Sequence, residues 1–244
     1  MIKNALFGLV SLVSIAAANP AWAVVTTFAT VSDNNQDFNW AASGGTGTLN
    51  TDSAQGAIVD FQYTNISGLP SYLQGNLEAY MIINNGLGAT TTGSASETNG
   101  TFNQNMNRTM TIEFELVTPI NGLSDLLTVT ISKKGSNTPT LSGNGSVVSI
   151  TTSSNSFNEV FTSDFLSFAN ASIYSSVIGF NSVSPALSLN GSQLSNFAAS
   201  ALLANFSADP VPTVVPEPGS LAALIGGLMA LTFVARRRRT NNSV

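Results

Sequence analysis

Apolar and polar residues alternate along several short stretches in the middle of the chain, between residues 24 and 209. In Ile58–Thr64, the apolar residues Val59, Phe61 and Tyr63 are separated by polar ones. Successive side chains of an extended backbone point to opposite faces, so this period of two predicts a β-strand with one buried and one solvated face. The same reasoning predicts strands at residues 76–83, 109–116 and 127–132, and a weaker alternation predicts further strands at 147–151, 159–168 and 173–183.

Clusters of Gly and Asn separate these stretches, as at residues 43–45, 84–86 and 134–137. Tight reversals need positive φ angles, which Gly and Asn adopt at the lowest cost. Many short strands joined by turns, with no alternation of strands and helices, predict an all-β fold. We expect an antiparallel β-sandwich of jelly-roll-like or immunoglobulin-like type over residues 24–209.

Two segments of this body fit the pattern less well. Residues 193–206 combine helical spacing of apolar residues with the option of a closing strand, and we favour the strand. Residues 85–104 consist almost entirely of Thr, Ser, Gly, Asn and Ala. Such a composition offers little apolar surface to offset the entropy of ordering, which predicts an exposed loop or a frayed sheet edge.

The first 23 residues have the organisation of a signal peptide. Lys3 precedes an apolar stretch at residues 6–18, which ends at Asn19 and Pro20. The small residues Ala21 and Ala23 then flank Trp22, as signal peptidase requires, so we expect cleavage after Ala23. An uncleaved membrane anchor is the alternative.

The other end of the chain predicts a membrane segment facing the same way. Residues 210–219 form a proline-rich linker that we expect to be an extended spacer without helix or sheet pairing. Residues 220–239 contain an uncharged apolar run and then Arg236, Arg237, Arg238 and Arg239, and a short tail at 240–244 follows. Arginines beside an apolar helix mark the cytoplasmic side, so the body is expected to face away from the cytoplasm.

Pro216, Glu217 and Pro218, the short apolar helix and the arginine cluster together resemble the PEP-CTERM sorting signal. The resemblance implies recognition and trimming near the motif by exosortase, a membrane-embedded enzyme similar to cysteine proteases, in a Gram-negative bacterium that makes exopolysaccharide. Segments 161–170 and 185–212 also resemble the ends of short PEP-CTERM β-domain proteins without an assigned activity. Hydropathy alone would equally allow an ordinary single-pass tail anchor.

Composition narrows the chemistry of the body. Apart from the basic residues at the termini, three basic residues stand against 13 acidic ones, which gives the body a formal charge of −10. That charge argues against binding nucleic acid or an anionic membrane surface. The absence of Cys and His from the chain removes disulfides, Ser-His-Asp and Cys-His catalysis and nearly every zinc site.

A few residues remain as candidates for binding or catalysis. Glu113 and Glu115 lie two apart on a predicted strand and share its polar face, where solvated carboxylates are more common than a glycosidase pair. The segment with Asp33, Asn35 and Asp37 has the spacing that begins a calcium loop, but it lacks the glycine and glutamate that complete one. Aromatic rings could stack on sugars, the candidates being Trp40, Tyr72, Tyr80 and Tyr174, although packing in the core or at a sheet edge is the more common role of such rings.

These observations favour an exported, non-catalytic surface or extracellular-matrix protein associated with exopolysaccharide or biofilm, rather than an enzyme. One alternative is a carbohydrate- or calcium-dependent binding module, which an aromatic-lined concave face would reveal. A second is a glycan-active hydrolase, which needs two convergent carboxylates in a cleft. Expected partners are signal peptidase and exosortase during export and polysaccharide afterwards, with calcium as the one cofactor that the residues leave open.

Overall fold

The computed structural model describes residues 25–216, except for residues 34, 36, 85, 92, 107 and 108. The predicted signal peptide and the predicted membrane helix with its arginines therefore lie outside the described residues. Within them the fold is all-β and antiparallel, and the one helical element that is described is a short 3-10 turn, η1 (Ser71–Leu73). No helix in this part of the chain has the length and hydrophobicity to cross a membrane.

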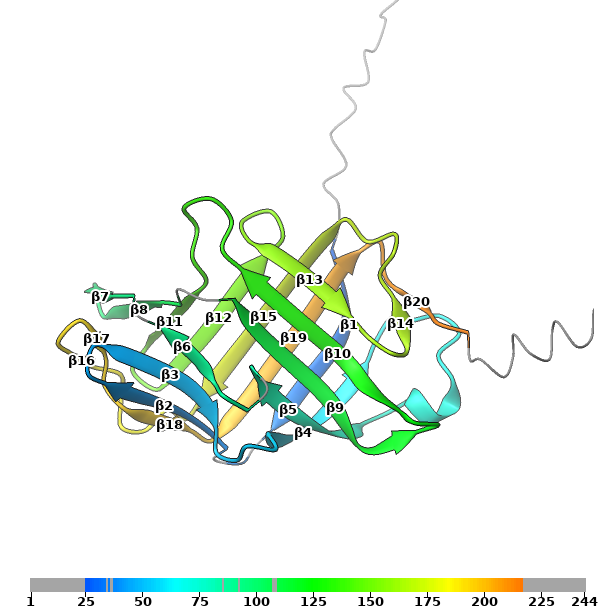
Figure 1. Ribbon diagram of the computed structural model, residues 1–244, viewed down its shortest axis with the longest axis horizontal. Coiled ribbons are helices and arrows are strands. Elements are labelled where there is room, and N and C mark those ends of the chain that lie inside the picture. Colours follow the sequence, from blue (N-terminus) through cyan, green and yellow to red (C-terminus); the bar gives the residue numbers. More distant parts are fainter. Residues whose placement is uncertain are drawn as a thin grey trace, which may run out of the picture.

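A twelve-stranded sheet forms the main body of the molecule (Figure 1). Its strands, in spatial order, are β13 (Asn158–Thr162), β10 (Leu123–Ser132), β9 (Met110–Ile120), β5 (Leu77–Ile83), β4 (Ala57–Tyr63), β1 (Thr26–Asp33), β19 (Ala201–Asp209), β15 (Ile173–Asn181), β12 (Val147–Ser153), β11 (Thr140–Asn144), β8 (Thr101–Asn105) and β7 (Ala95–Thr98). The first strand, β1, lies in the middle, where it pairs with β4 on one side and β19 on the other.

Three smaller sheets complete the fold. The largest contains β18 (Phe197–Ala199), β2 (Phe38–Ser43), β3 (Thr46–Thr51) and β6 (Ala89–Thr91). The two hairpin-sized sheets pair β16 (Leu189–Asn190) with β17 (Gln193–Leu194), and β14 (Leu166–Ser167) with β20 (Thr213–Val214). Figure 1 shows β16 and β17 beside the ends of β2 and β3, with β7 and β8 close by.

Aromatic side chains pack the two halves of the large sheet against each other. Phe114 on β9 lies 5.3 Å from Phe206 on β19 between ring centroids, and Phe161 on β13 lies 6.2 Å from the same ring. Phe38 on β2 meets Phe180 on β15 at 5.2 Å, so the four-stranded sheet covers the same core. Edge-to-face contacts of this kind add to the stabilisation from buried area.

The strands predicted from period-two alternation are confirmed, except that the one predicted at 159–168 is interrupted and forms β13 and β14. Val59, Phe61 and Tyr63 on β4 are buried, as the alternation requires, and so are Ile112 and Phe114 on β9. The favoured strand at residues 193–206 is also confirmed, because this segment forms β17, β18 and the start of β19.

Residues 85–104 differ from the predicted exposed loop. They contain β6, most of β8 and the whole of β7, and β7 is the end strand of the large sheet. Ala89 on β6 is buried in the core, and hydrogen bonds along the ladder order the more exposed β7, which pairs with β8 from Ala95 to Thr98. The expectation of a sheet edge was therefore right, and that of an unstructured loop was wrong.

The proline-rich linker also begins later than expected. Thr213 and Val214 form β20 against β14, and the amide of Val215 donates to Phe165 O at 2.9 Å. The prolines interrupt this segment without preventing a short edge ladder, where only some amides need partners. The folded body therefore continues to residue 215.

Candidate functional site

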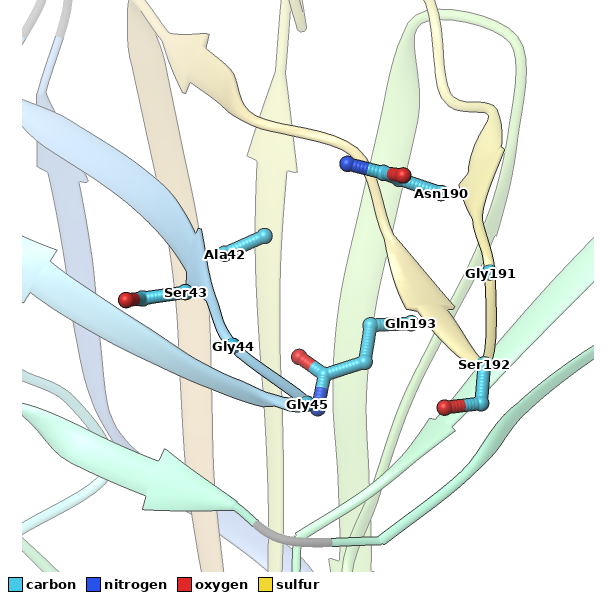
Figure 2. Close-up of a pocket in the computed structure, with 8 residues that line it drawn as sticks. All are labelled: Ala42, Ser43, Gly44, Gly45, Asn190, Gly191, Ser192 and Gln193. Carbon is cyan, nitrogen blue, oxygen red and sulfur yellow. The ribbon is translucent and has the colours of Figure 1, made fainter.

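A pocket opens between the turns of two hairpins, β2–β3 and β16–β17 (Figure 2). Its volume is about 320 Å³, near the lower end of the range for small-molecule sites. It is lined by Ala42, Ser43, Gly44, Gly45, Asn190, Gly191, Ser192 and Gln193. None of these side chains carries a charge, so the pocket offers only amide, hydroxyl and backbone groups to a ligand.

Glycine shapes both turns. Gly44 and Gly45 occupy a two-residue loop between the paired residues Ser43 and Thr46, with φ angles of +53° and +90°. Two consecutive positive φ angles fit a type I′ hairpin, which twists with its strands. In the opposite turn Gly191 has φ +65° between β16 and β17. The sequence thus folds two tight reversals that present backbone, not bulky side chains, to the space between them.

Hydrogen bonds fix the two walls to each other. The indole Nε1 of Trp40 on β2 donates to Leu194 O at 3.1 Å, and the amide of Ala42 donates to Asn196 Oδ1 at 2.7 Å. On the far side, the amide of Ala95 donates to Ser192 O at 2.6 Å. The β16–β17 hairpin is consequently held between the β2–β3 hairpin and the end of the large sheet.

The side chain of Gln193 sets this pocket apart. It is 3% exposed, and neither its Oε1 nor its Nε2 has a hydrogen-bond partner among the described residues. In Figure 2 its carboxamide points from β17 towards the Gly44–Gly45 turn, and Asn190 points into the same space. A buried polar group without a partner costs about 1–3 kcal/mol, and each such group in a native fold needs an explanation.

Gln104, on the neighbouring β8, is a buried glutamine whose polar atoms do have hydrogen-bond partners. It is fully buried, its Oε1 accepts the Leu194 amide at 3.1 Å, and its Nε2 donates to Gly93 O at 2.8 Å. Of these two buried carboxamides, that of Gln104 has its polar atoms bonded, whereas that of Gln193 has no partner among the described residues.

Of the two roles open to Trp40, sugar stacking and packing, the structure shows packing in the core. It is 1% exposed and stacks on Phe197, with ring centroids 6.4 Å apart and planes inclined by 9°. Gly47 makes room for the ring, since a Cβ there would lie 2.5 Å from Trp40 Cε2. Trp40 is not among the residues that line the pocket, but it joins two of the elements that form it, through its hydrogen bond to Leu194 O.

The other aromatic candidates lie elsewhere. Tyr72 is 36% exposed in η1, in the connection between β4 and β5, at the opposite end of the molecule from the pocket in Figure 1. Tyr174 packs on Phe161 at 4.9 Å, and Tyr80 is half-buried on β5 opposite Ile58. The structure does not gather these rings into one aromatic-lined face.

The acidic turn forms a local hydrogen-bonded bend. Asp33 ends β1, is 8% exposed, and accepts the Asn35 amide on Oδ1 at 3.0 Å. Burial, followed by the charges of Asp52 and Asp33, raises the pKa of Asp37. Among the residues that the structure describes, no group of three or more Asp, Glu, His or Cys side chains could hold a metal ion.

The candidate glutamate pair lies on the outer face of β9. Burial, and then the charge of Glu115, raises the pKa of Glu113. Glu115 is opposite Asp125 on β10, whose pKa burial raises to about 7, with the charge of Asp164 adding to the rise and a hydrogen bond from Thr128 opposing it. The Ser124 and Asp125 amides both donate to Asp164 Oδ2 at 3.0 Å, so the Asp164 carboxylate stabilises the irregular, bulged part of β10.

Glu159 on β13 is a buried acidic group that sequence reasoning did not single out. It is 3% exposed, and its Oε1 accepts hydrogen bonds from Thr152 at 2.8 Å and Ser176 at 2.5 Å. Burial raises its pKa, and the two hydroxyl donors oppose that rise. Because these partners come from β12 and β15, Glu159 joins the end strand to the facing half of the sheet.

Of the residues predicted for sorting and for signal-peptide cleavage, Pro216 alone is among the described residues. Pro216 is exposed at the end of the described chain, whereas Glu217, Pro218 and Arg236–Arg239 lie outside the described residues, as do Ala21 and Ala23. Comparison with protein-family profiles, curated proteins and solved structures finds no significant match.

Proposed function

We propose that this chain is an exported, non-catalytic protein of the PEP-CTERM type that works at the cell surface or in the extracellular matrix, in association with exopolysaccharide. The observation that carries the proposal is the pairing of a signal-peptide-like leader with a Pro-Glu-Pro motif, an apolar segment and terminal arginines. The two ends predict the same orientation independently. Signal peptidase and exosortase are the proposed processing enzymes.

The test is replacement of both motif prolines, Pro216→Ala with Pro218→Ala, in the native host. We expect the variant to accumulate as an uncleaved precursor in the inner membrane, whereas the wild-type protein reaches the surface or the medium. Val215→Ala is the matched control, because Val215 adjoins the motif and is 38% exposed. Normal processing of the double variant would refute the exosortase assignment.

The body suits a protein that is exposed to a polysaccharide. Its strands are rich in Ser, Thr and Asn on their solvent faces, and its pocket is polar without charge. We also interpret the folded sheet as an open β-sandwich of jelly-roll-like or immunoglobulin-like type, because rings on β9 and β13 pack on β1 and β19.

A carbohydrate-binding module is the second candidate function, and the pocket between the two hairpins favours it. The experiment is retention of the purified protein on polysaccharide extracted from the host. Retention in moderate salt would support binding by the body, because the pocket has no charged side chain and salt screens mainly exposed charges. Loss of all retention would leave the protein as a matrix component without glycan affinity of its own.

A further inference from the structure

We propose that the pocket between the β2–β3 and β16–β17 turns binds a neutral, hydroxyl-rich ligand, a glycan unit, and that the Gln193 carboxamide is its principal polar contact. The choice of a glycan rests on the proposed function, whereas the position of the site rests on the structure alone.

The first support is the state of Gln193. Its carboxamide is buried, points towards the Gly44–Gly45 turn and has no partner among the described residues, although the fold satisfies the carboxamide of Gln104, which accepts the amide of the next residue, Leu194. Folds retain groups that conflict with local stability chiefly where they serve a function. A ligand that both donates to Oε1 and accepts from Nε2 would satisfy the side chain.

The second support is the chemistry of the lining. A hydroxyl group is a donor and an acceptor at once, which matches a carboxamide, and Asn190 brings a second carboxamide to the same space. Ser43 and Ser192 add hydroxyl groups to the rim. The absence of charged side chains from the lining and the acidic body both favour a neutral glycan over an anionic one.

The third support is the shape of the turns. Gly44 and Gly45 have open space where a Cβ would be, so a ligand can approach the backbone there and the turn can shift without a side-chain clash. Such a shift would expose the carboxamide, which points towards this turn in Figure 2. An extended peptide fits less well, because two reverse turns offer no free strand edge for it to join.

The experiment compares Gln193→Met with the wild-type full chain, purified in detergent. The probes are neutral oligosaccharides of glucose, galactose and mannose, an oligogalacturonate and an uncharged Gly-Ser peptide, measured by titration calorimetry. We expect the wild type to bind at least one neutral oligosaccharide, and Gln193→Met to bind it about tenfold or more weakly, since the ligand loses both of its amide contacts. Gln62→Met, on the outer face of β4, is the control and should bind as the wild type does.

Thermal denaturation provides the readout that separates a ligand contact from a structural one. Gln193→Met should keep or raise the midpoint by a few degrees, because no hydrogen bond is lost, whereas Gln104→Met should lower it clearly. Equal binding by Gln193→Met, or a drop in its midpoint like that of Gln104→Met, would overturn the proposal. So would a wild type that binds only the peptide, only the oligogalacturonate, or no probe. None of these results depends on cleavage or export of the chain. The test with the motif prolines can therefore succeed while the ligand proposal fails, and the ligand proposal can succeed while that test fails.

Discussion

Gly47→Ala tests whether the Trp40 ring packs between Gly47 and Phe197, next to the pocket wall that its hydrogen bond to Leu194 O helps to fix. Gly47 is on β3, and a Cβ there would lie 2.5 Å from Trp40 Cε2 and 2.7 Å from Cη2, and closer still to Cζ2. The ring cannot recede easily, because it is 1% exposed, stacks on Phe197 and donates to Leu194 O. One added methyl group must therefore displace the indole or spread β2 from β3.

The magnitude follows from three contributions. Overpacking a filled core costs about 1–3 kcal/mol. Loss of the Trp40–Leu194 hydrogen bond, which leaves a buried partner unsatisfied, adds about 1–3 kcal/mol. Alanine recovers about 0.5–1 kcal/mol relative to glycine in a strand. The net expectation is a loss of about 1–5.5 kcal/mol in the free energy of unfolding, or about 0.5–2.5 M in the urea midpoint at a slope of about 2 kcal/mol per M.

The assay is urea denaturation followed by circular dichroism and intrinsic fluorescence, with Gly179→Ala as the matched control. Gly179 is also inside a strand, β15, but its Cβ would meet only Leu203 O, at 3.5 Å, an ordinary contact. That variant should keep its stability or gain up to about 1 kcal/mol. If Gly47→Ala loses no more stability than Gly179→Ala, Trp40 does not occupy the described position and the account of the pocket wall is wrong.

Three further predictions concern the charged groups and the core. Burial raises the pKa of the Asp125 carboxyl from 3.8 to about 7, so the folded protein binds this proton more strongly than the unfolded chain does. The free energy of unfolding should therefore fall as the pH rises from about 4 to about 7. Asp125→Asn keeps the acceptor for Thr128, and it should flatten this fall when urea midpoints are compared between pH 4 and pH 8. Burial also raises the pKa of Glu159, so the stability of Glu159→Gln relative to the wild type should increase as pH rises above 4.5, and thermal midpoints that differ equally at pH 5 and pH 8 would contradict this. Phe161→Ala should cost about 3–5 kcal/mol in urea denaturation, because the ring meets four other aromatic rings, whereas Val160→Ala, at a position 52% exposed, should stay within about 0.5 kcal/mol.

The parts of the fold that were predictable from sequence are strands with one buried face. On β4 and β9 the core imposes alternation directly on the residue types, so Val59, Phe61 and Phe114 reveal both the strand and its inner face. On β7, by contrast, residues Ala95–Thr98 are partly or fully exposed, and they are ordered by backbone hydrogen bonds, namely the ladder with β8 and the bond from the Ala95 amide to Ser192 O. Residue types therefore reveal which side chains of a strand are buried, but they reveal little about which backbone segments pair.

The candidate site was largely hidden from sequence reasoning for a related reason. Trp40 is buried because Gly47 leaves space for its ring, and that relation exists only once β2 and β3 pair. Gln193 follows an ordinary Asn-Gly-Ser turn, and nothing in its neighbours distinguishes it from Gln104. The difference between the two glutamines depends on which backbone groups reach them, and one of those that reach Gln104, the Leu194 amide, comes from 90 positions away.

The central position of β1 has a consequence for the order of folding. Thr26 pairs with Ala208, so the earliest strand of the body must wait for almost the last one before its second edge is covered. The large sheet therefore cannot assemble progressively from the amino terminus as the chain emerges, and contacts of such long range make folding slow. Until β19 arrives, β1 presents an open edge next to buried-face residues, which exposes the nascent chain to aggregation and gives holding chaperones time to bind it.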